Sequence, residues 1–285
     1  MTLLPPTTHL LYIDAGNTRV KCAYFEDGWE VIATLSYDEL DQLSNLLTNS
    51  MMVHLVISSV SDAFNSWFQT LAWSNTTFLT TADIPTERLD YETPHTLGLD
   101  RWLSCAGAYA LSQQTVAVCS AGSALTIDLM DHYGVFRGGI ILPGLDIIEK
   151  AAQLSAPRLP LAYLLNPVII PARSTDDCID AGARWMLAST LQKVLKSYEA
   201  QYGLLRVWAC GGRAADVVEL MQAGINAQDE DLLYVQKSLS TLYDQRDPVK
   251  LGKTSLYKDV RLDEFLVFRG MEQLYAIKQG ETNAP

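Results

Sequence analysis

Small polar residues follow an apolar stretch near the start of the chain, in a pattern suited to holding phosphate groups. The apolar residues 10–13 lead into Asp14-Ala15-Gly16-Asn17-Thr18, and Lys21 comes three residues later. Backbone N–H groups in such a turn can surround phosphate oxygens, while the Asp14 carboxylate can hold a hydrated Mg²⁺. Gly16 is expected to let the backbone turn sharply. A plain hairpin turn that uses Asp, Gly and Asn for geometry alone is the alternative interpretation.

The pattern returns in the second half of the chain. Ser120-Ala121-Gly122-Ser123-Ala124 aligns without a gap to residues 14–18, and the later turn glycine Gly134 aligns with Gly28. Each copy is an apolar strand, a small polar turn, a second strand and a glycine turn. We infer two copies of one phosphate-handling unit; a chance match of short apolar strands is the competing explanation.

A second group of residues could carry acid–base chemistry. Gly98-Leu99-Asp100-Arg101 stands at the expected start of a helix, where Asp100 can accept a proton from a hydroxyl and Arg101 can bind a carboxylate with two hydrogen bonds. Taken alone, the same residues fit a helix-start charge with a surface ion pair. Tyr91, shortly before this motif, is equally ambiguous.

Two glycine-rich segments have two interpretations each. The segment Gly138–Gly144 (GGIILPG) suits either close backbone approach to a ligand or a tight exit from a strand. Gly211-Gly212, between an expected strand and an expected helix, suits a nucleotide base or a simple turn.

Several common motifs are missing from the chain. Gly252-Lys253-Thr254 imitates the end of a P-loop, but Asp247 stands where its first glycine belongs. No GxGxxG, GxSxG or HExxH sequence occurs, and the four histidines are far apart, so a zinc site is not expected.

Composition narrows the class of protein. The 285 residues suit two domains, and the net charge of −12 with scattered Lys and Arg argues against nucleic acid as the main partner. Five cysteines occur singly in apolar surroundings, which is typical of reduced thiols. No signal peptide or apolar run of membrane-spanning length is recognisable. We expect a soluble, cytoplasmic protein.

The apolar pattern predicts alternating strands and helices. Expected strands are 10–14, 19–26, 29–35, 53–58, 76–80, 115–119, 124–130, 134–141, 206–210 and 264–268. Expected helices are 37–49, 61–72, 99–112, 175–201, 213–222 and 270–279. Most of the polar stretch 223–262 gives no clear pattern. The order implies two α/β domains facing a cleft, which we place at 9–113 and 114–285.

Together these residues resemble the type III pantothenate kinases, members of the acetate and sugar kinase/Hsc70/actin superfamily. The family's DxGNTxxK is matched by Asp14 to Lys21, its Tyr and GxDR by Tyr91 and Gly98 to Arg101, and its GGxIxPG by Gly138 to Gly144. A further family feature, a Thr opening a helix with Gly in its first turns, is matched by Thr175 to Gly182. The similarity extends from residue 10 to about 215 and resumes at 264–271.

The resemblance implies two duplicated actin-like (ribonuclease H-like) domains flanking a nucleotide cleft, and ATP-dependent phosphorylation of pantothenate in coenzyme A synthesis. It implies Asp100 as the general base and a Mg²⁺ ion held through water by Asp14. ATP would be bound by Asp14, Ala15, Gly16, Asn17, Thr18, Arg19, Val20, Lys21 and Ser123. Pantothenate would be bound by Tyr91, Gly98, Leu99, Asp100, Arg101 and Thr175.

The same resemblance implies a homodimer, with Thr175 reaching the substrate site across the interface. The helix 175–201 could supply that interface through Trp185, Met186, Leu187 and Leu191, although an ordinary core helix explains them too. No nucleic acid or membrane partner is expected.

One departure from the family pattern affects the expected cofactors. The family's second phosphate motif is DxGTA, whose Asp helps to hold a monovalent cation, whereas this chain has Ser120 and Ser123 in place of its Asp and Thr. A neutral hydroxyl is a weaker ligand for K⁺ or NH₄⁺ than a carboxylate, so cation dependence is expected to be altered or lost. A non-catalytic regulator on the same fold, and a phosphohydrolase or kinase of another substrate, are the alternative functions.

Overall fold

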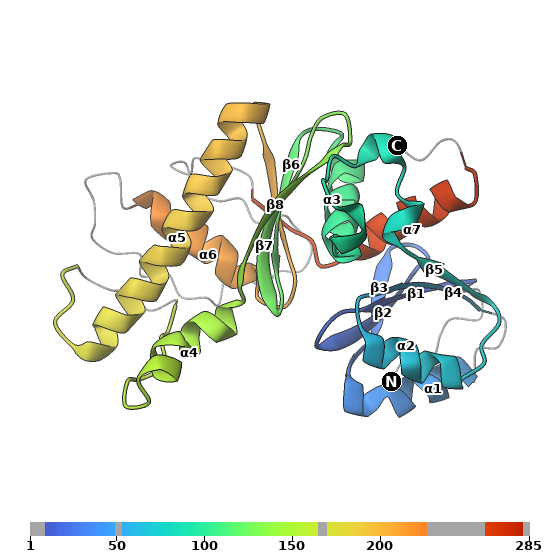
Figure 1. The fold of residues 1–285 in the computed structure, drawn as a ribbon, viewed down its shortest axis with the longest axis horizontal. Coiled ribbons are helices and arrows are strands. Elements are labelled where there is room, and N and C mark those ends of the chain that lie inside the picture. Colours follow the sequence, from blue (N-terminus) through green and yellow to red (C-terminus); the bar gives the residue numbers. More distant parts are fainter. Residues whose placement is uncertain (1–8, 49–52, 165–169, 227–259, 282–285) are drawn as a thin grey trace. The chain divides into compact units, whose positions relative to one another are not determined.

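The computed structural model describes residues 9–48, 53–164, 170–226 and 260–281, which form two compact units (Figure 1). The first unit contains the described residues within 1–113, 134–137 and 265–285, and the second those within 114–133 and 138–264. The C-terminal helix, which the sequence division groups with residues 114–285, therefore packs in the first unit.

The first unit is built on a five-stranded mixed sheet. Its strands, in spatial order, are β3 (Trp29–Ser36), β2 (Arg19–Phe25), β1 (Leu10–Ala15), β4 (His54–Ser59) and β5 (Thr76–Leu79). The β1–β2 and β2–β3 pairs are antiparallel, and β1–β4 and β4–β5 are parallel. Parallel neighbours need a crossover, which the helices between the strands supply.

Helices cover both faces of this sheet (Figure 1). On one face, α1 (Leu40–Thr48) and α2 (Asp62–Thr70) pack against Leu11, Ile13 and Ala15 of β1. On the other lie α3 (Leu99–Ser112) and α7 (Leu266–Lys278). Because side chains alternate along a strand, Tyr12 and Asp14 face the α3/α7 side. Short 3₁₀ turns η1 to η4 lie at Tyr37–Glu39, Thr81–Asp83, Thr86–Arg88 and Pro94–Thr96.

The second unit repeats this plan. Its strands are β6 (Val116–Ala121), β7 (Ala124–Met130), β8 (Phe136–Pro143), β9 (Arg206–Cys210) and β10 (Arg261–Leu262), in the spatial order β10-β9-β6-β7-β8. One face carries α4 (Leu145–Ser155), α5 (Thr175–Tyr202) and α6 (Ala214–Asn226). If β1 to β5 are replaced by β6 to β10, the order of the first sheet becomes β8-β7-β6-β9-β10. This is the order of the second sheet read from its other edge, which confirms the predicted duplication.

One predicted strand is wrong, and one helix was missed. The segment 264–268 is not a strand: β10 ends at Leu262 and α7 begins at Leu266, an error expected for a short apolar run. Helix α4 was not predicted, because Pro143-Gly144 was interpreted only as the end of the preceding strand and not also as the start of a helix. Within the unassigned stretch 223–262, residues 227–259 lie outside the described part, as do Asp247 and Gly252-Lys253-Thr254.

Helices α3 and α7 touch backbone to backbone through two glycines. A Cβ atom added at Gly270 would lie 2.0 Å from the Leu103 carbonyl oxygen, and one at Gly107 would lie 2.1 Å from the Leu266 carbonyl oxygen. Both separations are far below van der Waals contact. Each helix thus offers a glycine where the other helix's backbone passes, so neither position tolerates a larger residue without separating the helices.

We expect Gly270→Ala to destabilise the protein by about 1–3 kcal/mol, because overpacking outweighs the better helix propensity of alanine. Gly182→Ala is the matched control: it also replaces a helical glycine, but nothing lies within 4 Å of the added methyl group. That control should be stabilised by about 0.5–1 kcal/mol. Urea unfolding measures both, and a Gly270→Ala protein as stable as the control would contradict the packing explanation.

Candidate phosphate-binding and acid–base site

The first polar turn joins β1 to β2 and is held by two hydrogen bonds. The Gly16 N–H donates to the Arg19 carbonyl oxygen over 3.0 Å. The Tyr37 hydroxyl, from the η1 turn after β3, donates to the Gly16 carbonyl oxygen. The β1–β2 register pairs Asp14 with Lys21, so these two side chains lie on the same face of the sheet.

The expected reason for glycine at position 16 is wrong. Gly16 does not have the positive φ that favours glycine, and an added Cβ would meet only the Arg19 carbonyl oxygen, at an ordinary 3.5 Å. The fold itself therefore accepts a larger residue at this position. The open space beside the turn is compatible with a ligand approaching the backbone.

Five of the predicted ATP-binding residues, Ala15 and Asn17 to Val20, divide into two groups. The side chains of Asn17, Thr18 and Arg19 are exposed at the turn. Ala15 and Val20 are completely buried in the core on the α1/α2 side. Only the backbone of these two residues can therefore take part in binding.

Asp14 is an acid in an unfavourable environment for negative charge. Burial, and secondarily the charge of Asp100, raise its pKa to about 7, while Lys21 acts in the opposite direction. Asp14 and Asp100 are therefore close enough to interact, although they come from β1 and α3. Lys21 offsets part of the pKa rise at Asp14, and the charge of Arg101 opposes the pKa rise at Asp100.

Asp100 lies in the first turn of α3, where the helix dipole favours an anion. Its carboxylate bends back over Gly98, and a Cβ atom at that position would lie 2.6 Å from Oδ1 of Asp100. Burial raises the pKa of Asp100; the Arg101 backbone N–H and the Arg101 charge oppose that rise. The glycine of the GxD motif thus has a structural reason, because it leaves room for the Asp100 carboxylate.

Arg101 faces aromatic rings. Its side chain is buried, its guanidinium carbon lies 5.9 Å from the Phe136 ring centroid, and its Nη1 is 3.5 Å from the Tyr91 hydroxyl. The Tyr91 and Phe136 rings are also in contact, with centroids 6.2 Å apart. The segment that carries Tyr91 is held to β8 by the Asp90–Arg137 ion pair. The structure thus brings together two of the predicted pantothenate-binding residues, whereas Leu99 points into the core.

The second polar turn, between β6 and β7, is closed by a 2.9 Å hydrogen bond from the Gly122 N–H to the Ala124 carbonyl oxygen. Ser123 is exposed at its tip. Ser120 lies opposite Cys210 in the β6–β9 register, and the Ser120 Oγ is 3.0 Å from the Cys210 Sγ. The hydroxyl that replaces the family's carboxylate therefore has a protein partner.

Glycines from both glycine-rich segments pack closely on the second unit's own backbone. A Cβ at Gly144 would lie 2.4 Å from the Ser123 carbonyl oxygen, and one at Gly211 would lie 2.4 Å from the Ala121 carbonyl oxygen. A Cβ at Gly139 would lie 2.3 Å from the Ile127 carbonyl oxygen. These three glycines are therefore explained by contacts within the fold.

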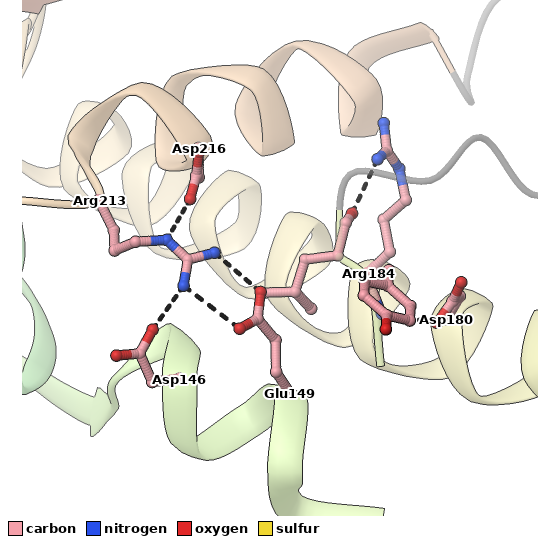
Figure 2. A network of polar contacts seen from close by, with 8 residues as sticks. Asp146, Glu149, Asp180, Arg184, Arg213 and Asp216 are labelled. Carbon is pink, nitrogen blue, oxygen red and sulfur yellow. Dashed lines mark hydrogen bonds and ion pairs between the residues drawn. The ribbon is translucent and has the colours of Figure 1, made fainter. Parts of the chain in front are cut away.

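A cluster of charges connects the segments that flank this turn (Figure 2). The Arg213 guanidinium bonds Asp146 and Glu149 of α4 and Asp216 of α6, with Nη2 2.8 Å from the Glu149 Oε1. These carboxylates, Glu149 first, raise the pKa of Arg213 above its ordinary value. The backbone N–H of Arg213 also donates a hydrogen bond to the Ala121 carbonyl oxygen. Arg213 thus connects α4, α6 and the second turn.

Helix α5 begins at Thr175 as predicted, with the Ser174 hydroxyl accepting a hydrogen bond from the Asp177 N–H. Trp185 and Met186 are exposed on this helix, whereas Leu187 and Leu191 lie in the core. The interface expectation for these two leucines is therefore wrong. In Figure 2, α5 also presents Asp180 and Arg184, which bond the backbone of Tyr163 and Leu164.

Sequence reasoning missed Tyr37, Phe136 and Arg213. Each acts through a contact with a residue distant in the sequence, and none belongs to a recognised motif. The sequence placed Phe136 in the expected strand 134–141, but could not show that it lies beside Arg101.

The solved structures with the same fold include a putative transcriptional activator of the Baf family from Campylobacter jejuni. It has 19% identity and a TM-score of 0.57, over 95% of this chain and 99% of that one. A putative N-acetylmannosamine kinase from Listeria monocytogenes has 9% identity and a TM-score of 0.50, over 96% and 99%. Both likenesses concern the fold alone, which here is two units built on sheets of equivalent strand order.

Sequence comparison is more specific. The family model described as type III pantothenate kinase matches residues 10–197. A type III pantothenate kinase of Flavobacterium johnsoniae is 30% identical over 82% of this chain and 97% of its own length. Another, from Aromatoleum aromaticum, is 29% identical over 74% and 89%. The two polar turns and the GxDR motif described above lie within the matched region, and the chain belongs to the type III pantothenate kinase family.

Proposed function

We propose that the chain transfers the terminal phosphoryl group of ATP to the hydroxyl group of pantothenate, the first step of coenzyme A synthesis. Its relatives carry the name of this activity. The observation that supports it most directly is the coupling of Asp14 and Asp100, two partly buried acids with raised pKa values at the end of β1 and the start of α3. Such a pair is typical of a site that handles a proton beside phosphates.

Asp100 is the proposed general base. Its carboxylate accepts the proton of the pantothenate hydroxyl as that oxygen attacks the phosphorus atom. Burial favours this role because the raised pKa makes the group a better proton acceptor. Arg101, with Tyr91 beside it, would bind the pantothenate carboxylate, and Gly98, Leu99 and Thr175 complete the proposed substrate residues.

The first turn would hold the phosphates of ATP through its backbone N–H groups, the exposed Asn17 and Thr18, and the charge of Lys21; Ser123 would contribute from the second turn. A divalent cation fits this site, because Asp14 offers a partly buried carboxylate beside the turn, and Lys21 opposes the pKa rise caused by burial and by Asp100 without cancelling it. Asp14 would hold Mg²⁺ through water, and the bound ion would reduce the negative charge on the transferred phosphate.

We propose that a monovalent cation is not required. Position 120 offers a neutral hydroxyl that already contacts Cys210. K⁺ or NH₄⁺ would therefore lack a charged ligand at this position.

We propose a homodimer formed through α5, because Trp185 and Met186 expose 38% and 53% of their surface on adjacent positions of this helix. No helix within the described residues is long and apolar enough to cross a membrane. All five cysteines lie in the described part and are free thiols, which favours the reducing cytoplasm as the location.

The replacement of the family's carboxylate at Ser120 also keeps a second candidate function open: a non-catalytic regulator that binds the same ligands. Retention of Asp14, Lys21, Asp100 and Arg101 favours catalysis. A phosphohydrolase would instead release phosphate from ATP in the absence of pantothenate.

Purified protein with ATP and pantothenate should form 4'-phosphopantothenate, and Asp100→Asn should lower kcat by about 10²–10⁴, the usual effect of losing a general base. Asp62→Asn is the matched control, because Asp62 also lies in the first turn of a helix, but on the opposite face of the first sheet. Full turnover by Asp100→Asn would refute the assignment of the base, and no product from the wild type would refute the activity.

The rate should change less than about twofold when K⁺ replaces Na⁺ or tetramethylammonium at constant ionic strength, since only a neutral side chain stands at position 120. Initial rates at saturating ATP and pantothenate measure this effect. A strict requirement for K⁺ would show that other groups bind the ion.

Sedimentation equilibrium at micromolar concentration should show a dimer for the wild type and a monomer for Trp185→Glu/Met186→Glu. The exposed Leu204 lies just after α5, and Leu204→Glu serves as a control that adds the same kind of charge elsewhere. A double variant that stays dimeric would exclude this face of α5 as the interface.

A further inference from the structure

Ser58 lies directly beside Asp14 in the first sheet. The parallel β1–β4 register pairs Asp14 with Ser58, and parallel neighbours in register project to the same face. That face is the one covered by α3 and α7, because Leu55 and Ile57 of β4 belong to the core on the opposite face. Ser58 therefore shares the face of Asp14, Lys21 and the helix that carries Asp100.

The Ser58 hydroxyl is buried without a partner. The residue is 1% exposed, and no hydrogen-bonding group within the described residues reaches its Oγ. Another buried serine of the same unit, Ser104 of α3, donates to the Arg101 carbonyl oxygen over 3.0 Å. An unsatisfied buried hydroxyl costs stability, so its presence needs an explanation. Binding to a ligand is one such explanation.

The second sheet shows what side chains at these two positions can reach. By the duplication, β6 and β9 correspond to β1 and β4, so Ser120 and Cys210 occupy the positions of Asp14 and Ser58. In that sheet the two side chains contact each other, with the Ser120 Oγ 3.0 Å from the Cys210 Sγ. Side chains at this pair of positions thus point into a common space. In the first sheet that space is bordered by an acid with a raised pKa and a hydroxyl without a partner.

We propose that Ser58 is a further ligand-positioning residue, whose hydroxyl binds the hydrated divalent cation and terminal phosphate that enter beside Asp14. The inference rests on the proposed phosphoryl transfer and extends it to a residue outside the recognised motifs. A hydroxyl is a suitable partner here, because it can donate to a phosphate oxygen or accept from cation-bound water without adding a third negative charge beside Asp14 and Asp100. Ser58 acts on binding and orientation and transfers no proton.

Truncation to alanine distinguishes a serine that binds a ligand from a serine that stabilises the fold, because the two variants change ligand binding and melting temperature differently. Ser58→Ala removes an unpaired hydroxyl, so the melting temperature of the ligand-free protein should stay unchanged or rise. The increase in melting temperature caused by Mg²⁺ with a non-hydrolysable ATP analogue should shrink, and KM for ATP should rise about tenfold, which is the effect of losing one hydrogen bond to a charged group. Ser58→Cys has a similar side-chain volume and a weak S–H donor. Its KM for ATP should lie between those of the wild type and Ser58→Ala.

Ser59→Ala is the matched control. Ser59 is the next residue of β4 but faces the other side, and its hydroxyl already bonds the backbone of Ser61, at 3.2 and 3.3 Å. This variant should keep the wild-type response to Mg²⁺ and nucleotide. A Ser58→Ala protein that melts lower but keeps the full response would show a purely structural serine, and one with wild-type values throughout would equally overturn the proposal. Loss of the response in Ser58→Ala, with no phosphorylation of pantothenate by the wild type, would refute the proposed function alone.

Discussion

The close contact between α3 and α7 determines where Asp100 lies in the first unit. Gly107 and Gly270 allow the two helices to meet at their backbones, and α7 also packs against β1 and β4. A helix held this closely cannot shift along its neighbour without steric clash, because packed interiors leave few voids. The first turn of α3, with the carboxylate over Gly98, is therefore placed with respect to the end of β1. Rigid support of this kind is what acid–base chemistry requires of its scaffold.

Burial is what makes the two acids chemically distinct from surface carboxylates. The charge of Asp100 adds to the effect of burial on Asp14, and Lys21 offsets the resulting pKa rise only in part. Such an arrangement costs stability and becomes more favourable when a cation binds, because the ion adds positive charge beside Asp14. The second sheet has the same strand order with Ser120 and Cys210 at the equivalent positions, and avoids this cost. The two halves of the duplication have thus diverged in charge, while their backbones remain equivalent.

Much of the fold followed from local patterns, and the errors have physical causes. The spacing of Asp14 and Lys21 predicted a turn between two strands, and the structure pairs these residues across that turn. The sequence predicts a strand over 264–268, because five residues that are mostly apolar fit the period of a strand as well as that of a helix. In the structure the helix begins at Leu266, in contact with α3, which is distant in the sequence. Ser58 could not be recognised from the sequence at all, since its importance comes from a register between β1 and β4.

The position of α7 has a consequence for how the protein is made. The sheet of the first unit begins with β1 at Leu10, yet its α3 face is completed by a helix that starts at Leu266. When the first sheet has left the ribosome, α7 has not yet been synthesised, so the nascent first unit exposes the apolar side of α3 while the second unit is made. Folding of the first unit is therefore completed only after α7 has left the ribosome, and the second unit is the part that can acquire its core while translation continues.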